Sequence, residues 1–152
     1  MGTVVESMVV IERPVTDVFE FLLDLERSMP LVETDVESVV RTPQGPIGAG
    51  TIYRMRRTSR ATFGLGRRRG SLRYTAVEPS RKIEFEARFG PIAPAGSLTF
   101  EPANEGTRVT FRGDPNPVGP FKLLAPLIAR QGQRVWDKRL ARIKTILETP
   151  GS

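Results

Sequence analysis

Two tyrosines, Tyr53 and Tyr74, and two arginines, Arg57 and Arg73, are the side chains of this sequence best suited to polarise a bound molecule. An unperturbed tyrosine titrates near ~10 and an arginine above ~12, so all four would donate hydrogen bonds or protons at neutral pH. The tyrosines are therefore weak candidates for catalytic acids. The alternative is that both are core phenols whose hydroxyls lie near a rim.

The types of residue that are absent limit the chemistry further. The sequence has no histidine and no cysteine, which excludes Ser-His-Asp and Cys-His triads and disulfides. Zinc would need an all-carboxylate site, which is rare, so we expect no metal and no cofactor. A general base would have to be a carboxylate, and only Glu6 and Glu101 have strand positions that could point inward. This weakens the case for an enzyme that abstracts protons.

The charges are unevenly distributed along the 152 residues. Lysine and arginine number 23 against 17 acidic residues, and residues 38–77 contain nine arginines and no aspartate or glutamate. Such a stretch predicts either a solvated basic face of a sheet or a surface for an anionic partner. No aromatic residue is interleaved with the arginine run at 67–69 as single-stranded nucleic acid would require, which argues against nucleic acid.

Alternating patterns and turn residues predict seven strands, and helical spacing predicts two longer helices. The strands are expected over 4–12, 33–41, 51–60, 65–78, 82–89, 96–102 and 107–113, and the helices over 14–26 and 118–148. Pro14 suits the first position of a helix, and residues 28–30 should end that helix, leaving at most one further short turn. Pro126 predicts a kink or a break in the second helix. Trp136, Leu140, Ile143 and Leu147 form one apolar stripe that we expect to be buried against the sheet.

This order of elements implies an α+β domain, and the sequence resembles the START-like (SRPBCC) superfamily, which includes polyketide cyclases/dehydratases and lipid-transfer domains. The resembling segments are 10–14 running into 18–22, 24–26 with Pro30, 48–50, Tyr74 with 78–79, 106–110, and 140–144 through 147–148. The resemblance implies the helix-grip fold, a curved antiparallel sheet of about seven strands around a long C-terminal helix, with short helices after the first strand. We expect one ligand-binding domain over 1–149 and a tail over 150–152.

The resemblance also implies a cavity between the sheet and the long helix. Strand phase places aromatic and methionine side chains on one face of the sheet, and helical phase places small residues of the long helix above them. The expected ligand-binding residues are Tyr53, Met55, Tyr74, Phe85, Phe89, Phe100, Phe111, Ala129, Gly132 and Trp136. The alternative is that these side chains simply fill a core.

Binding of a hydrophobic or aromatic small molecule or lipid is the function that these patterns favour. The first alternative is a polyketide cyclase/dehydratase-like enzyme, and the second is an interaction module that meets an anionic partner through the basic sheet face. Leu123, Leu124 and Leu127 should either pack on the first helix, which we favour, or form a homodimer patch. No apolar run reaches the ~20 residues of a membrane-spanning helix, so we expect a cytoplasmic protein.

Overall fold

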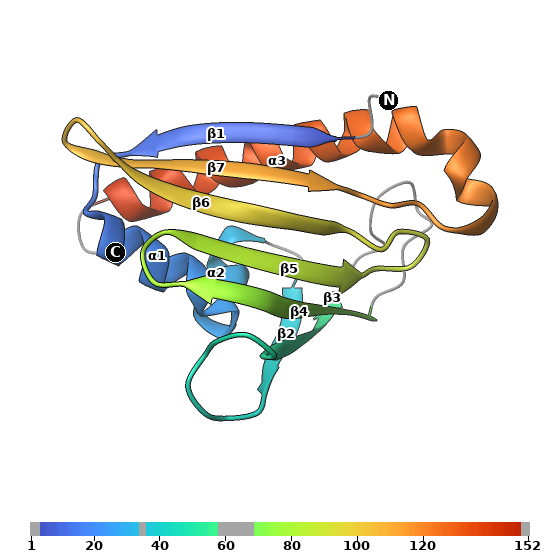
Figure 1. Ribbon diagram of the computed structural model, residues 1–152, viewed down its shortest axis with the longest axis horizontal. Coiled ribbons are helices and arrows are strands. Elements are labelled where there is room, and N and C mark those ends of the chain that lie inside the picture. The colour runs from blue at the N-terminus through green and yellow to red at the C-terminus, as the bar shows by residue number, and fades with distance from the viewer. Residues whose placement is uncertain (1–3, 34–35, 58–68, 150–152) are drawn as a thin grey trace.

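Seven strands form a single antiparallel sheet in the order β1-β7-β6-β5-β4-β3-β2 (Figure 1). This computed structural model describes residues 4–33, 36–57 and 69–149. The strands are β1 (Val5–Ile11), β2 (Val36–Thr42), β3 (Ile52–Arg57), β4 (Arg69–Glu78), β5 (Lys82–Arg88), β6 (Ala95–Ala103) and β7 (Gly106–Asp114). The helices are α1 (Val15–Leu23), α2 (Leu25–Val32), the 3₁₀-helix η2 (Gly119–Leu124) and α3 (Ala125–Glu148).

The curved sheet and the long terminal helix α3 enclose the core, which confirms the predicted helix-grip arrangement. Alternation along the strands builds the inner face of the sheet. In β7, for example, Thr107, Val109 and Phe111 are buried, while the side chains between them are more exposed. The strands β1 and β2 lie at opposite edges of the sheet, so α1 and α2 carry the chain from one edge to the other.

The segment after β1 differs from the single helix predicted over 14–26. It forms two helices, because Asp24 adopts an extended conformation between them. The Asp24 carboxylate accepts a hydrogen bond from the backbone N–H of Glu26 at 3.2 Å, as an N-cap residue does. The predicted break at residues 28–30 is wrong, since α2 continues through Pro30 to Val32. Proline removes only one backbone donor there, and the N–H of Glu33 still reaches the Met29 carbonyl at 2.8 Å.

The predicted second helix is divided near Pro126, as expected. The 3₁₀-helix η2 occupies 119–124, and α3 begins at Ala125 with Pro126 in its first turn, where proline is tolerated. Leu140, Ile143 and Leu147 are buried, which confirms three members of the predicted stripe. Trp136 was also expected to be buried, but it is only partly so.

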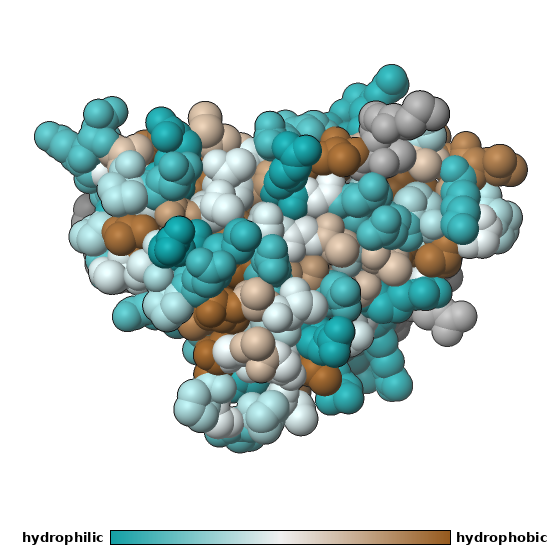
Figure 2. Space-filling model, viewed as in Figure 1, coloured by the Kyte–Doolittle hydropathy of each residue, from teal (hydrophilic) through white to brown (hydrophobic). Residues whose placement is uncertain are grey.

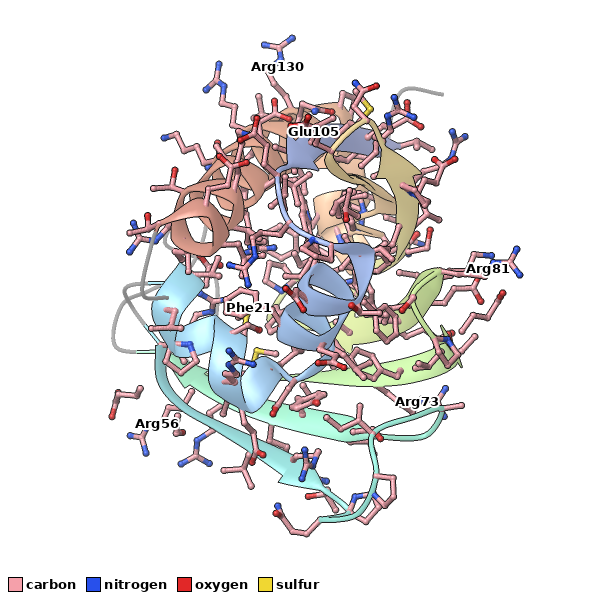
Figure 3. All side chains as sticks on the ribbon, turned by 90° about the vertical axis from the view of Figure 1, so that its left-hand side faces the viewer. Phe21, Arg56, Arg73, Arg81, Glu105 and Arg130 are labelled. Atoms are coloured by element: carbon pink, nitrogen blue, oxygen red, sulfur yellow. The ribbon has the colours of Figure 1, made fainter. Side chains whose placement is uncertain are left out.

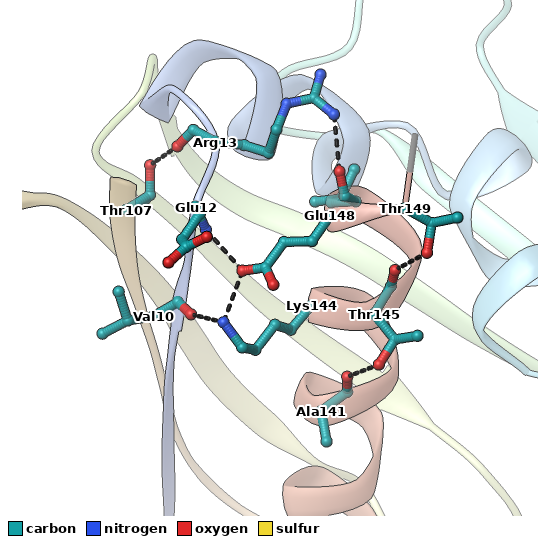
Figure 4. A network of polar contacts seen from close by, with 10 residues as sticks. Val10, Glu12, Arg13, Thr107, Ala141, Lys144, Thr145, Glu148 and Thr149 are labelled. Carbon is teal, nitrogen blue, oxygen red and sulfur yellow. Dashed lines mark hydrogen bonds and ion pairs between the residues drawn. The ribbon is translucent and has the colours of Figure 1, made fainter. Parts of the chain in front are cut away.

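Polar contacts attach the C-terminal end of α3 to the end of β1 (Figure 4). The Lys144 ammonium donates to the Val10 carbonyl at 2.7 Å and to the Glu148 carboxylate at 2.6 Å. The same carboxylate accepts from the backbone N–H of Glu12 at 2.8 Å. The hydrogen bond from Lys144 lowers the pKa of Glu148 below its ordinary value of 4.5. These bonds attach the C-terminal end of α3 to β1. The same helix forms part of the wall of the cavity described next.

Candidate functional site

A cavity of about 500 Å³ lies between the inner face of the sheet, α2 and α3. Side chains from the sheet form one wall, and Gly132, Trp136 and Ile143 of α3 face them. Leu25, Met29 and Val32 contribute from α2. The volume is within the range of ~300–1,000 Å³ that is usual for small-molecule sites.

Strand alternation accounts for the aromatic wall. Met55, Tyr74, Phe85 and Phe111 are all buried and all line the cavity. The Trp136 indole stacks on the Phe111 ring with centroids 3.7 Å apart and planes 7° apart. This stacking of two aromatic rings joins Trp136 of α3 to Phe111 of β7 on the cavity wall.

Seven of the ten residues predicted for the site lie on the cavity wall. They are Met55, Tyr74, Phe85, Phe89, Phe111, Gly132 and Trp136. The structure places Tyr53, Phe100 and Ala129 in the core and away from this wall. Phe100 packs edge-to-face on Phe19 of α1, with centroids 5.2 Å apart, so α1 fills the space at that end of the sheet.

The two tyrosines share a single acceptor. Tyr53 and Tyr74 both donate to the backbone carbonyl of Leu23, at 3.1 Å and 2.6 Å. Burial raises the pKa of Tyr53 above its ordinary value of 10.0 and raises that of Tyr74 well above it. Both phenols are therefore neutral near pH 7, with their protons directed at the main chain between α1 and α2. This arrangement supports a structural role for both hydroxyls.

Three ionic side chains form a group on the cavity wall, and of these only Arg57 was among the predicted candidate donors. This ion cluster consists of Glu33, Arg57 and Arg139. Arg139 donates through Nε to Glu33 Oε1 at 3.1 Å, and Arg57 Nη2 lies 3.8 Å from the same oxygen. The Arg139 guanidinium also lies 4.4 Å from the centroid of the Trp136 ring. All three side chains are less than one-fifth exposed, so the cluster places both signs of charge within a mostly apolar wall.

The expectation that only Glu6 and Glu101 could be inward carboxylates is wrong. Both are exposed, whereas Glu33 and Asp114 line the cavity. Glu33 was missed because the pattern placed it at the start of a strand, while it actually follows the last residue of α2. Arg57 was predicted as a candidate donor and does line the cavity, since it is two residues beyond Met55 on the same face of β3.

Phe89 reaches the cavity because a glycine lies opposite it. A Cβ atom on Gly70 would come within 2.1 Å of the Phe89 ring, so any other residue in that position of β4 would displace the ring. The Arg57 guanidinium lies 6.0 Å from the centroid of the same ring. Phe89 thus joins the ion cluster to the aromatic wall.

The cavity has a mouth beside Leu124 and Leu127, because these two side chains line it and are also exposed to solvent. Pro91, Ile92 and Pro94 come from the connection between β5 and β6, and Leu124 and Leu127 come from the end of η2 and the first turn of α3. The preference for packing Leu123, Leu124 and Leu127 on the first helix is wrong, because all three are exposed.

The outer face of the sheet is not uniformly basic. Arg54, Arg56 and Arg73 are exposed, and Figure 3 shows Arg56 and Arg73 on the outside of the molecule. Arg73 pairs with Glu86 at 2.9 Å, so carboxylates of other segments offset part of the basic stretch. Arg73 therefore does not belong to the cavity. Three arginines of that stretch, at 60, 67 and 68, lie outside the described residues.

Two features are absent from the described part of the chain. Among residues 4–33, 36–57 and 69–149, no group of three or more acidic side chains could hold a metal ion. Within the same ranges, no helix is long and apolar enough to cross a bilayer.

The chain is similar to proteins of one family and one fold. The model of a family described as "Polyketide cyclase / dehydrase and lipid transport" matches residues 1–148. A comparison with curated proteins finds no match. The crystal structure of TTHA0849 from Thermus thermophilus aligns with a TM-score of 0.74 and 22% identity, over 98% of this chain and 99% of that one.

Two other solved structures share the fold. DynU16, a putative protein in the dynemicin biosynthetic locus, aligns with a TM-score of 0.67 and 20% identity over 97% of this chain and 48% of that one, so this chain spans about half its length. The Aha1 dimer from Colwellia psychrerythraea aligns with a TM-score of 0.67 and 14% identity over 98% of both chains. At these low sequence identities, the similarity to the three solved structures shows a shared fold alone.

Proposed function

The chain belongs to the polyketide cyclase/dehydrase and lipid transport family, and from that premise we propose that residues 1–149 form one domain that binds a hydrophobic or aromatic small molecule or lipid. The observation that carries the proposal is the cavity of about 500 Å³ with its aromatic and aliphatic wall. A void of this kind favours an apolar guest over water, because water finds few partners there.

The ion cluster adds a preference within that class. Glu33 and the two arginines are the charged groups that a guest would meet beside Trp136 and Phe89. A guanidinium carries five N–H donors in a fixed plane, so a guest with one polar oxygen directed at the cluster should bind better than a pure hydrocarbon of the same size.

A cyclase-like activity is the second candidate. Arg57 and Arg139 line the cavity, and guanidinium groups are good donors to carbonyl oxygens as charge develops on them. Tyr53 and Tyr74 contribute less, because their protons are already engaged by the Leu23 carbonyl. Turnover of a poly-carbonyl substrate that fails in Arg139→Gln but persists in Tyr74→Phe would support this candidate.

Thermal unfolding tests the binding proposal. N-phenylnaphthylamine, an uncharged aromatic probe, at ten times its Kd should raise the free energy of unfolding by about 1.4 kcal/mol. For a domain of this size the melting temperature should then rise by roughly 3–6 °C. Naphthalenedisulfonate, which presents a similar ring with two charges, should produce no shift. The proposal would be wrong if a panel of uncharged apolar probes left the melting temperature unchanged.

A further inference from the structure

Exposed leucines gather at the mouth of the cavity. The leucine patch, defined as Leu123, Leu124 and Leu127, is exposed by 88%, 43% and 51%. Of the seven large hydrophobic side chains exposed in the described residues, these three lie within five positions of the chain. Figure 2 shows brown, hydrophobic side chains at the right-hand end of the molecule, where Figure 1 places η2 and the start of α3. Such a concentration marks an interaction surface.

The charged side chains of η2 and of the first half of α3, which carry the leucine patch, are all positive. Residues 115–136 contain Lys122, Arg130 and Arg134 and no aspartate or glutamate. All three are exposed, and Arg130 points outward from α3 (Figure 3). Arg130 also borders a groove of about 240 Å³ whose other walls are Pro126 and the leucine patch. The partner of this surface must therefore offer apolar groups to the leucines and negative charge to Lys122 and Arg130.

A second copy of the chain does not meet that requirement. In a symmetric dimer the same patch lies on both sides of the contact. Lys122 and Arg130 would then approach their own counterparts, and residues 115–136 supply no carboxylate to offset them. Like charges brought together in this way oppose association.

An anionic lipid bilayer meets both requirements. Apolar side chains of an interfacial segment enter the boundary between headgroups and acyl chains, while nearby lysines and arginines attract anionic headgroups. We propose that η2 and the first turn of α3 form a docking surface for an anionic membrane, with the leucine patch inserted and Lys122 and Arg130 on the headgroups.

Docking through the leucine patch would place the cavity next to the bilayer. Leu124 and Leu127 belong both to the patch and to the cavity wall. A lipid or other apolar guest would pass from the bilayer to the cavity along side chains of these two residues with little exposure to water. This consequence rests on the proposed function, whereas the docking surface stands without it.

Sedimentation with vesicles tests the docking surface. The protein should bind vesicles of phosphatidylcholine containing phosphatidylserine, and binding should weaken steeply as salt screens the charges. Leu123→Asp should reduce binding by about ten-fold or more, since a carboxylate replaces an inserted side chain. The matched control is Leu31→Asp, which makes the same change at an exposed leucine of α2 and should leave binding unchanged.

A variant that lacks two positive charges separates the attraction to anionic headgroups from the insertion of leucine side chains. Lys122→Gln combined with Arg130→Gln should remove the preference for phosphatidylserine vesicles over pure phosphatidylcholine vesicles. Arg81→Gln, at an arginine whose side chain is 80% exposed elsewhere, should preserve that preference. Leu123, Lys122 and Arg130 are off the cavity wall, so all these variants should still bind N-phenylnaphthylamine.

Three outcomes would overturn the docking surface. They are wild-type protein that ignores phosphatidylserine vesicles, a Leu31→Asp variant as impaired as Leu123→Asp, and a wild-type dimer that Leu123→Asp dissociates while vesicles bind neither form. The dimer would assign the leucine patch to a second copy. Apolar-probe binding without vesicle binding leaves the proposed function intact, and vesicle binding without apolar-probe binding leaves the docking surface intact.

Discussion

Replacing Leu140 by alanine should lower the free energy of unfolding by about 2–5 kcal/mol, as other large-to-small core substitutions do. Leu140 is only 1% exposed and belongs to the buried core between α3 and the sheet. The substitution removes apolar contacts and leaves a space that the surrounding β-strands can only partly close. Chemical denaturation, monitored by circular dichroism, measures the change.

Leu123 provides the matched control for this prediction. It is the same residue type in the adjoining η2, but it is 88% exposed. Leu123→Ala should change the free energy of unfolding by less than about 0.5 kcal/mol, because exposed substitutions rarely do more. Equal effects of the two substitutions would mean that α3 does not pack on the sheet as described.

Replacing Gly132 by leucine should abolish binding of N-phenylnaphthylamine while the fold survives. Gly132 lines the cavity from α3, and a Cβ atom there would make an ordinary contact of 3.4 Å with the Val5 side chain. The remainder of the leucine side chain would occupy the volume available to a guest. Removing glycine from the interior of a helix also gains up to ~1 kcal/mol of helix propensity, which offsets strain from the added side chain. Dye fluorescence should show a loss of affinity of about ten-fold or more.

Lys138→Leu controls for adding a leucine to the same helix, because Lys138 is exposed on α3. It should leave dye binding unchanged. Ala129, the other small residue of α3 that was expected to bind the ligand, lies in the core and off the cavity wall, so Ala129→Phe would report overpacking of the core instead. If Gly132→Leu folded normally and bound the dye with wild-type affinity, the dye site would lie elsewhere.

Periodicity was sufficient to predict the order of strands and helices and the inward face of the sheet, and the resemblance to the START-like superfamily implied how these elements assemble. Alternation placed Met55, Phe85 and Phe111 on the side that the structure buries, because a strand has only two faces. Periodicity cannot say how far along a strand the cavity extends. Tyr53 has the same phase as Met55, but Tyr53 lies beneath the junction of α1 and α2, where its hydroxyl meets Leu23.

The polar part of the site was less predictable, because it depends on side chains from separate elements. Glu33 follows α2, Arg57 ends β3 and Arg139 lies in α3, and tertiary packing brings them together. The sequence patterns placed Glu33 at the start of a strand, whereas it directly follows α2. Its place on the cavity wall was therefore not predicted. The leucine patch was predicted as an apolar group, but helical phase alone did not reveal that nothing in the described chain covers Leu123.

Quenching of Trp136 fluorescence is the most direct measurement of whether an apolar guest occupies the cavity. Trp136 is the sole tryptophan of the sequence, and it lines the cavity against Phe111. Bromine quenches indole fluorescence only at close range, so bromodecanol should quench Trp136 in a saturable way while decanol should not. Decanol should compete with bromodecanol, and Gly132→Leu should remove the quenching. An unquenched wild type, or saturable quenching that Gly132→Leu leaves intact, would contradict ligand binding in this cavity.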